Sequence, residues 1–196
     1  MAKKRKYTQK KRAESAEETR RRIVEATVEL HQEIGPRATT ISAIAERAGV
    51  QRLTIYRHFP DETAVFQACT SHWLEDHPLP DPGSWQTIDD AAERTRTALR
   101  TLYRYYAQTQ AMWDAAHRDE PDVPALQQPM AAVREYLAGI ADDLVRALSV
   151  GGRPKKALTA TAHHAVAFRT WQSLDQASMT PDQAAEAVTN WIAASR

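Results

Sequence analysis

Residues 37–59 read Arg-Ala-Thr-Thr-Ile-Ser-Ala-Ile-Ala-Glu-Arg-Ala-Gly-Val-Gln-Arg-Leu-Thr-Ile-Tyr-Arg-His-Phe. The first half of this stretch has apolar residues at the i, i+3, i+4 and i+7 spacing of one helical face, namely Ile41, Ile44, Ala45 and Ala48. Gly49 follows, and glycine ends helices readily because it adopts the left-handed conformation without a Cβ penalty. Val50 can fill the turn, and Ile55 and Phe59 repeat at i+4 as the buried side of a second helix. The stretch therefore predicts a helix-turn-helix.

The exposed face of the second predicted helix is polar and carries no carboxylate. It consists of Gln51, Arg52, Leu53, Thr54, Tyr56, Arg57 and His58. Cations, amides and hydroxyls without acidic side chains suit a helix that lies against the phosphates and base edges of DNA. A solvated face of a three-helix bundle is the alternative interpretation, but such a face usually mixes both charge signs. The pattern therefore favours DNA.

The segment over about residues 17–73 resembles the DNA-binding domain of the TetR family of bacterial transcriptional regulators. The residues that carry the resemblance are Ile23, Ala26, Leu30, 40–45, 49–50, 54–59 and 65–66. They follow one another in order over the first third of the chain, and the rest of the chain carries no family motif. The resemblance implies an all-α protein in which a three-helix helix-turn-helix DNA-binding domain precedes a helical domain for effector binding and dimerisation.

Charge is divided unevenly along the chain. Residues 1–60 hold 14 Lys and Arg against 7 acidic residues, whereas residues 61–196 hold 12 against 18. A basic amino-terminal third joined to an acidic remainder indicates that one part meets a polyanion and the other does not. Salt should weaken that association steeply, because each neutralised phosphate releases counterions.

Cysteine content and hydropathy point to the cytoplasm. Cys69 is the only cysteine, so the chain cannot form an intrachain disulfide, which suits a reducing compartment. The basic amino terminus is not followed by the apolar segment of a secretory signal, and no apolar run approaches the ~20 residues needed to cross a bilayer. We expect a cytoplasmic protein with no membrane partner, associated with the nucleoid when it is bound to DNA.

Residues 1–16 predict a basic flexible arm. They carry seven Lys and Arg with almost no apolar content, so they cannot bury enough surface to offset the entropy of ordering the chain. We expect them to be disordered in isolation. The arm could follow the DNA backbone or enter the minor groove, or it could serve only as a solubilising tail, and the sequence does not choose between these roles.

Residues 17–75 form the predicted DNA-binding domain. Its first helix should run from about residue 16 to 34 and stop at a Gly-Pro pair. Thr39 or Thr40 can cap the second helix by accepting a hydrogen bond from an amide in its first turn. Asp61 is expected to cap a fourth helix, which should join the two domains physically.

Residues 76–196 form the predicted effector-binding and dimerisation domain, beginning with a proline-rich linker. Helical periodicity then marks four segments, at 85–118, 124–149, 154–178 and 181–195. No stretch alternates at period two for long enough to indicate a sheet, so the whole chain is predicted to be all-α.

Several residues of the motif have an expected role on DNA. Arg52 can pair with guanine O6 and N7, Gln51 can pair with adenine in the same bidentate way, and Leu53 can touch a thymine methyl group. Arg57 can go to a phosphate or to an acidic neighbour. His58 can donate a hydrogen bond even when it is neutral, because a neutral imidazole keeps one N–H.

The resemblance implies further DNA contacts and one departure. It implies phosphate hydrogen bonds from Thr40, Thr54, Tyr56 and His58. Ser42 stands where relatives often carry a longer polar residue that reaches a base. Relatives also commonly place a lysine two or three residues after the His-Phe pair, whereas this chain has Asp-Glu-Thr there, where a carboxylate would repel a phosphate. We expect Glu62 to point away as a charge favoured at a helix start, and the basic arm to supply more of the affinity.

Aromatic residues are frequent in the second domain and could line an apolar pocket with a few polar groups. The candidate ligand-binding residues are Tyr103, Tyr106, Met112, Trp113, His117, Tyr136, Phe168, Trp171 and Gln172. Ordinary core packing is the alternative for each of them. The resemblance favours a cavity, whose lining implies an apolar or aromatic small-molecule effector.

The last two predicted helical segments carry small and apolar residues that suit close helix packing. In the family, the corresponding pair packs against its twofold mate as a four-helix bundle. This implies a homodimer interface that includes Ala165, Phe168, Ala184, Val188 and Trp191. A dimer also suits DNA readout, since two recognition helices must reach successive major grooves about 34–36 Å apart.

Catalytic and metal-binding patterns are missing from the sequence. There is no glycine-rich phosphate loop, no nucleophile elbow and no zinc-protease motif. His163 and His164 are adjacent, so on a helix they point about 100° apart and cannot readily share a metal. His72 and His77 lack a third ligand with recognisable spacing. We expect no enzyme activity, no metal and no cofactor.

Together these features predict a ligand-responsive repressor that binds a palindromic operator as a homodimer. A ligand would favour a conformation whose recognition helices no longer match the groove spacing, with the fourth helix as the lever. The alternative is a DNA-binding regulator controlled by a protein partner, with no small-molecule pocket. The sequence leaves the operator, the effector and the sign of regulation open.

Overall fold

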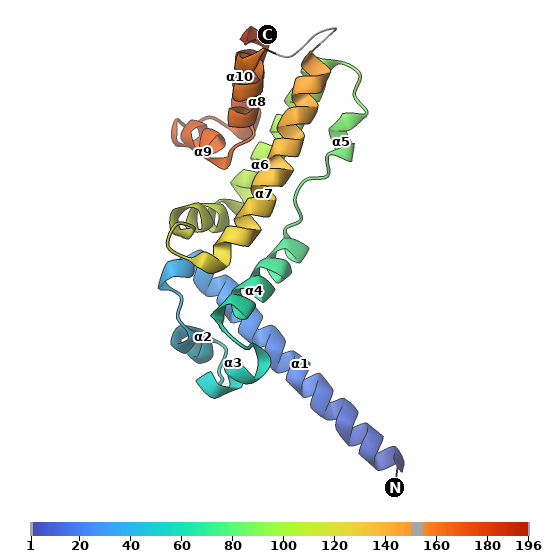
Figure 1. The fold of residues 1–196 in the computed structure, drawn as a ribbon, viewed down its shortest axis with the longest axis vertical. Helices are drawn as coiled ribbons and strands as arrows, with labels where there is room; N and C mark the ends of the chain where they lie inside the picture. The colour runs from blue at the N-terminus through green and yellow to red at the C-terminus, as the bar shows by residue number, and fades with distance from the viewer. Residues whose placement is uncertain (1, 150–154, 196) are drawn as a thin grey trace. The chain divides into compact units, whose positions relative to one another are not determined.

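The computed structural model describes residues 2–149 and 155–195, and within these ranges every regular element is a helix (Figure 1). The elements are α1 (Ala2–Glu33), the 3-10 helix η1 (Pro36–Ala38), α2 (Ile41–Arg47), α3 (Arg52–His58), α4 (Glu62–Asp76), α5 (Gly83–Gln86), α6 (Ala91–Asp119), α7 (Pro124–Leu148), α8 (Lys156–Ala165), α9 (Phe168–Gln176) and α10 (Pro181–Ala194). The predicted all-α fold is confirmed.

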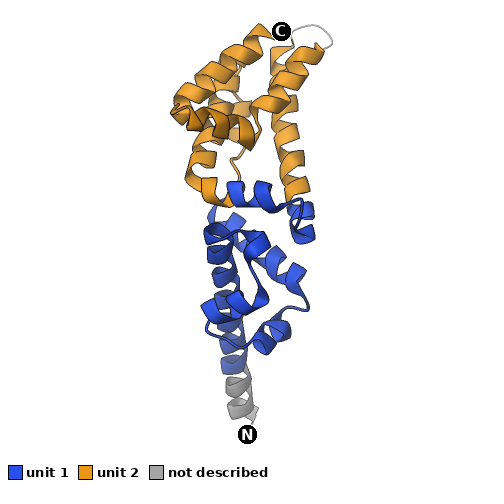
Figure 2. Ribbon diagram, turned by 90° about the vertical axis from the view of Figure 1, so that its left-hand side faces the viewer, with its two compact units in different colours: residues 1–77, 114–129 blue, residues 78–113, 130–196 orange. Residues whose placement is uncertain are grey.

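Two compact units divide the chain (Figure 2). The first contains residues 1–77 and 114–129, and the second contains residues 78–113 and 130–196. We expected a single boundary near residue 75, with everything after it in the second domain. The end of α6 and the start of α7 cluster with the amino-terminal unit instead. Sequence patterns cannot reveal this, because the hydrogen bond from the Arg37 N–H to Asp119 spans 82 positions.

Helix α1 begins at Ala2, much earlier than the predicted start near residue 16. The structure therefore continues a helix through the segment expected to be a flexible arm. Lys, Arg, Ala, Gln and Glu dominate this segment, and all are good helix formers. The Lys10 ammonium lies 3.8 Å from the Glu14 carboxylate at i+4, a pairing that supports an exposed helix. Residues 10–18 are exposed throughout, so local propensity rather than packing accounts for the helix here.

The core of the first unit lies where α1 meets α2, α3 and α4. Its buried residues are Ile23, Val24, Ala26, Leu30, Ile41, Ile44, Ala45, Ala48, Ile55, Phe59, Val65 and Phe66. The predicted apolar face of α2 and both predicted anchors of α3 are therefore buried. Gly35 and Gly49 have φ angles of 86° and 64°, so the chain turns at both ends of α2 through the conformation that favours glycine.

Side-chain caps fix the starts of α2 and α4. Thr40 is the N-cap of α2 and accepts a hydrogen bond from the Ala43 N–H at 3.2 Å. Asp61 is the N-cap of α4 and accepts one from the Ala64 N–H at 2.8 Å. Thr39 instead donates its hydroxyl proton to the Gly35 carbonyl at 2.8 Å. The predicted caps are confirmed, and each satisfies an amide that the first turn leaves without a helical partner.

The second unit contains a helix break that periodicity does not predict. The pattern indicates one segment over 154–178, but α8 ends at Ala165 and α9 begins at Phe168. The Tyr103 hydroxyl donates to the Ala165 carbonyl at 2.7 Å, and the Tyr106 hydroxyl donates to the next carbonyl at 2.8 Å. These hydroxyls, both from α6, satisfy carbonyls that the end of α8 leaves unpaired. The break is therefore stabilised by residues about 60 positions away.

His31 is a buried titratable residue of the first unit. It is 3% exposed, its ring meets Phe66 edge-on with centroids 4.4 Å apart, and its Nδ1 lies 3.5 Å from the Cys69 Sγ. Burial lowers the pKa of His31 from 6.5 to about 4, although the charge of Asp119 acts in the opposite direction. Burial also raises the pKa of Cys69 to about 12. The pair is therefore uncharged at neutral pH.

We predict that the free energy of unfolding falls as the pH drops from 6.5 towards 4, because the unfolded chain binds a proton on His31 that the folded chain does not. The loss attributable to His31 should be about 3 kcal/mol over this range. His31→Phe should remove this part of the pH dependence, as measured by urea unfolding curves across the range. His164→Gln, at an exposed histidine, is the matched control. An unchanged pH slope in His31→Phe would contradict the prediction.

Candidate nucleic-acid interface

Helix α3 presents the predicted polar face to solvent. Ile55 is 0% and Phe59 3% exposed, whereas Leu53 is 70% and Tyr56 46% exposed. The other residues of the predicted face are Gln51, Arg52 and Arg57, which are exposed, and Thr54 and His58, which are half-buried. The seven side chains of the predicted face thus reach the surface from α3 and its N-cap, whereas Ile55 and Phe59 point into the core.

A tight turn fixes α3 relative to α2. The Val50 N–H donates to the Ala45 carbonyl at 2.9 Å across Gly49. Gln51 is the N-cap of α3, and the Thr54 N–H donates to its carbonyl at 2.8 Å. Because backbone hydrogen bonds and the buried Ile55 hold the turn, the direction of α3 does not depend on its exposed side chains.

The start of α2 adds two polar groups near the motif. Thr40 and Ser42 are both exposed. The Thr40 hydroxyl oxygen already accepts a hydrogen bond from the Ala43 N–H. A hydroxyl has one proton to donate and two lone pairs, so Thr40 can cap α2 and still donate to a phosphate oxygen. The cap is confirmed, and the phosphate contact of Thr40 stays a prediction.

Arg47, the last residue of α2, is a cation that sequence patterns leave unassigned. Its guanidinium lies 2.6 Å from a Glu33 carboxylate oxygen and 3.1 Å from one of Glu29, both on α1. The hydrogen bonds that Arg47 donates to Glu33 and Glu29 raise the pKa of Arg47, and Arg47 in turn lowers the pKa of Glu33. These exposed pairs tie α2 to α1 rather than serving DNA.

Acidic residues follow α3 at the position where a phosphate contact would be unfavourable. Asp61 directs its carboxylate to the Ala64 N–H as the cap of α4, and Glu62 is exposed in the first turn of that helix. The predicted interpretation of Glu62 as a helix-start charge fits this position. At this end of α3, Arg20 of α1 places its guanidinium carbon 4.8 Å from the Phe59 ring centroid. That contact joins residues 20 and 59, so no local pattern could have revealed it.

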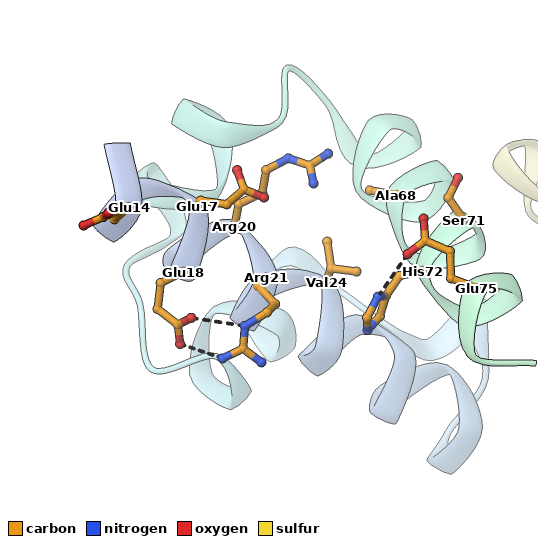
Figure 3. Close-up of a pocket in the computed structure, with 10 residues that line it drawn as sticks. All are labelled: Glu14, Glu17, Glu18, Arg20, Arg21, Val24, Ala68, Ser71, His72 and Glu75. Carbon is orange, nitrogen blue, oxygen red and sulfur yellow. Dashed lines mark hydrogen bonds and ion pairs between the residues drawn. The ribbon is translucent and has the colours of Figure 1, made fainter. Parts of the chain in front are cut away.

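An open groove between α1 and α4 is predominantly acidic (Figure 3). It has a volume of about 670 Å³ and is lined by Glu14, Glu17, Glu18, Arg20, Arg21, Val24, Ala68, Ser71, His72 and Glu75. Arg21 donates to both carboxylate oxygens of Glu18 at 2.7 and 3.1 Å, which lowers the pKa of Glu18. Four carboxylates against two arginines would repel a phosphate backbone inside the groove, so among its lining residues only Arg20, which also contacts the Phe59 ring, adjoins the candidate interface.

In the second unit, four of the candidate ligand-binding residues form one buried aromatic cluster. Tyr106 lies at its centre, with ring centroids 5.4 Å from Phe168, 5.9 Å from Trp171 and 6.2 Å from Trp113. Tyr103 is also fully buried and is held by its hydroxyl. Edge-on and tilted rings at these distances pack directly on one another. The geometry of these residues is that of an aromatic core.

The remaining candidates are dispersed. Gln172 is buried and Met112 half-buried, whereas His117 clusters with the first unit. Tyr136 donates its hydroxyl proton to the Pro80 carbonyl at 2.5 Å. It also lines a groove of about 460 Å³ on the second unit, together with Pro82, Gln86, Ala132, Glu135, Gly139 and Ile140. The structure therefore does not gather all nine candidates around one space.

The candidate dimer residues need correction. Ala165 and Phe168 are 1% exposed, and Ala184 and Val188 are 0% exposed, within the single chain. They already pack inside the second unit, so they cannot present a face to a second copy. Trp191 is the exception, at 47% exposed. The helical pattern identifies an apolar face, but it cannot distinguish a face buried within the chain from one buried by a partner.

The described residues contain neither a cluster suited to a metal ion nor a helix suited to a membrane. Among the described residues, no group of three or more His, Cys, Asp or Glu side chains is arranged to hold a metal ion. Over the same part of the chain, no helix combines the length and apolar character that a membrane span requires.

The amino-terminal unit matches a known family of bacterial regulators. The family model described as bacterial regulatory proteins, tetR family, matches residues 23–69, which include α2, α3 and the core they share with α1. The chain is 39% identical over 85 residues to the HTH-type transcriptional regulator SrpR of Pseudomonas putida, a match that covers 40% of each protein. It is 41% identical over 64 residues to the HTH-type transcriptional regulator TtgR, also of Pseudomonas putida, covering 33% of this chain and 30% of that protein.

Solved structures extend the similarity of fold over most of the chain. NalD, the secondary repressor of the MexAB-OprM multidrug efflux pump in Pseudomonas aeruginosa, superimposes with a TM-score of 0.60 at 17% identity, covering 93% of this chain and 97% of NalD. A TetR family transcription regulator from Marinobacter aquaeolei gives a TM-score of 0.57 at 20% identity, covering 94% of this chain and 97% of that protein. The amino-terminal unit therefore matches the TetR family of bacterial regulatory proteins over residues 23–69, and the helical fold of the chain is similar to that of these solved regulators.

Proposed function

We propose that the chain is a DNA-binding transcriptional regulator of the repressor type, which binds a palindromic operator as a homodimer and responds to a small molecule. The observation that carries the proposal is the carboxylate-free face of α3, which the buried Ile55 and Phe59 turn outward. A short helix with such a face suits the major groove. Such a protein would act in the cytoplasm, at the nucleoid when bound.

In this proposal the exposed residues of α3 divide into base readers and phosphate contacts. Arg52 and Gln51 stand at the start of the helix, where side chains of a recognition helix meet base edges. Leu53, 70% exposed, offers an apolar contact for a thymine methyl group. Contacts to phosphates then come from Thr40, Thr54, Tyr56, Arg57 and His58, whereas Ser42 stands where relatives often carry a longer polar residue that reaches a base.

Homodimerisation would use the outer faces of α8 and α10. Trp191 is about half exposed on α10, and the half-buried Ala187 lies one turn before it. Ala157 and Ala160 are exposed on α8. Small side chains around one large exposed aromatic support a close contact between helices of two copies. Dimerisation would place two α3 helices against one duplex.

The effector is proposed to be an apolar or aromatic small molecule held by the second unit. The support is the concentration of aromatic side chains in that unit, with a few hydroxyl and amide groups among them. Ring faces and edges provide favourable contacts for aromatic ligands. Since the rings of Tyr106, Phe168 and Trp171 contact one another, a ligand would have to move at least one of them.

The buried Asp119 carboxylate connects the end of α6 to the segment that leads into α2. Most of α6 belongs to the second unit, but its last residue, Asp119, lies in the first. Asp119 Oδ2 accepts a hydrogen bond from the Arg37 N–H at 3.0 Å, three residues before the cap of α2. Burial raises the pKa of Asp119, but hydrogen bonds from Arg118 and from the Arg37 N–H more than offset this, so its pKa is lowered. A displacement of the end of α6 would therefore also displace the segment that leads into α2.

The proposal predicts salt-sensitive binding of the full chain to duplex DNA flanking its own gene. Arg52→Ala should weaken binding to the preferred site by about 1–3 kcal/mol per half-site without unfolding the protein, because Arg52 is exposed. Fluorescence anisotropy at several salt concentrations, with thermal unfolding as the check on folding, measures both effects. Arg104→Ala, at an exposed arginine of the second unit that pairs with Asp182, is the control. Loss of binding in the control alone, or no binding by the wild type, would reject the proposal.

Coupling through Asp119 predicts a second result. Asp119→Ala removes the acceptor of the Arg37 N–H, a part-buried hydrogen bond made by a buried carboxylate, so the free energy of unfolding should fall by about 1–3 kcal/mol. Affinity for DNA should also fall while its salt dependence stays unchanged, because no phosphate contact is lost. Asp122→Ala removes only an exposed ion pair with Arg37, so it should change stability by less than about 1 kcal/mol. Equal effects of the two variants would argue against the coupling.

A further inference from the structure

Arg20 on α1 is placed at the carboxyl end of α3 by an aromatic ring. Its guanidinium carbon lies 4.8 Å from the centroid of Phe59, the C-cap of α3, whose N–H donates to the Ile55 carbonyl at 2.9 Å. Phe59 is 3% exposed, so its ring is fixed by the core, while Arg20 itself is exposed. A cation over a ring face is attracted to it without losing its N–H donors. The ring therefore orients Arg20 and leaves its donors available.

Arg21 and Arg47 of the first unit are bound to carboxylates, whereas Arg20 is not. Arg21 is held by Glu18 and Glu25, and Arg47 by Glu29 and Glu33. Across the described residues, no ion pair joins Arg20 to an acidic side chain, and Figure 3 shows its guanidinium directed away from the Glu18–Arg21 pair. Its charge is thus not paired with a carboxylate among the described residues.

The end of α3 carries Arg57 in its last turn, but acidic residues follow it directly along the chain. The two residues that open the next helix, Asp61 and Glu62, are acidic and exposed, and the carbonyl end of a helix is itself the negative end of its dipole. A phosphate next to His58 would meet this negative potential. Arg20 contacts Phe59 at that end, and its positive charge is opposite to the charges of Asp61 and Glu62.

We propose that Arg20 contacts a DNA phosphate beside the carboxyl end of α3, with Phe59 as the platform that holds it there. This inference rests on the proposed function and adds a contact from α1 to those of α2 and α3. The contact is electrostatic and carries no base specificity, because it is made to the backbone. It offsets the repulsion from Asp61 and Glu62 at the same end of the recognition helix.

The test compares the salt dependence of DNA binding among three variants of the full chain. Arg20→Gln should reduce the slope of log Kobs against log salt by about 0.9 per protomer, whereas Arg20→Lys, which keeps the charge, should retain most of the slope. Arg21→Gln is the matched control, since its arginine is already paired with carboxylates, and its slope should equal that of the wild type. The probe is a duplex covering the DNA that flanks the protein's own gene.

The outcomes separate this inference from the proposed function. If the wild type shows no salt-sensitive binding, the proposed function fails and the inference fails with it. If the wild type binds and Arg20→Gln keeps the wild-type slope, the proposed function stands and the inference alone is overturned. If Arg20 only covers Phe59, Arg20→Gln would lower the thermal unfolding temperature but leave the slope unchanged, and this result would also overturn it.

Discussion

Burial of Ile55 and Phe59 against the core of the first unit is the constraint on which the rest of the candidate site depends. A seven-residue helix such as α3 is too short to be stable by itself in water, so its existence and its rotation come from packing. Removing one such side chain from water contributes about 1.5–3 kcal/mol. Ile55 lies between Arg52 and Tyr56 on this short helix. Burial of the Ile55 side chain therefore also determines which residues of α3 face outward. Burial of Ile55 and Phe59 thus determines which side chains form the exposed face of α3.

Charges of the first unit are arranged around this surface in two different ways. Two arginines away from α3 are tied to carboxylates, Arg21 to Glu18 and Arg47 to Glu33. Such exposed pairs contribute little stability, but they remove positive charge from the sides of α1. The chain between Gln51 and His58 contains no acidic residue that could do the same for Arg52 or Arg57. Positive potential is therefore concentrated where the proposed function needs it.

Sequence alone predicted the features that depend on neighbours within one or two helical turns. The apolar face of α2, the anchors of α3 and the caps Thr40 and Asp61 all follow from local spacing and local hydrogen bonds. Features that depend on distant residues were missed. The break between α8 and α9 is stabilised by Tyr103 and its neighbour on α6, and four of the five candidate dimer residues are buried inside their own unit. Periodicity reports that a face is apolar, but not what covers it.

The hydrogen bond that joins the end of α6 to the segment before α2 has a free energy of the size that regulation requires. Allosteric couplings are typically about 1–3 kcal/mol, and leaving one buried amide without its acceptor costs about 1–3 kcal/mol. Breaking the hydrogen bond from the Arg37 N–H to Asp119 would therefore change the stability of one conformation by the amount that a switch requires. The bond lies at the end of a helix whose φ and ψ depart from helical values at Thr109, ten residues earlier. In the proposed function, a ligand that alters α6 on the other side of this irregularity would act on this hydrogen bond, and on the exposed Arg37–Asp122 ion pair beside it, to reach the segment before α2.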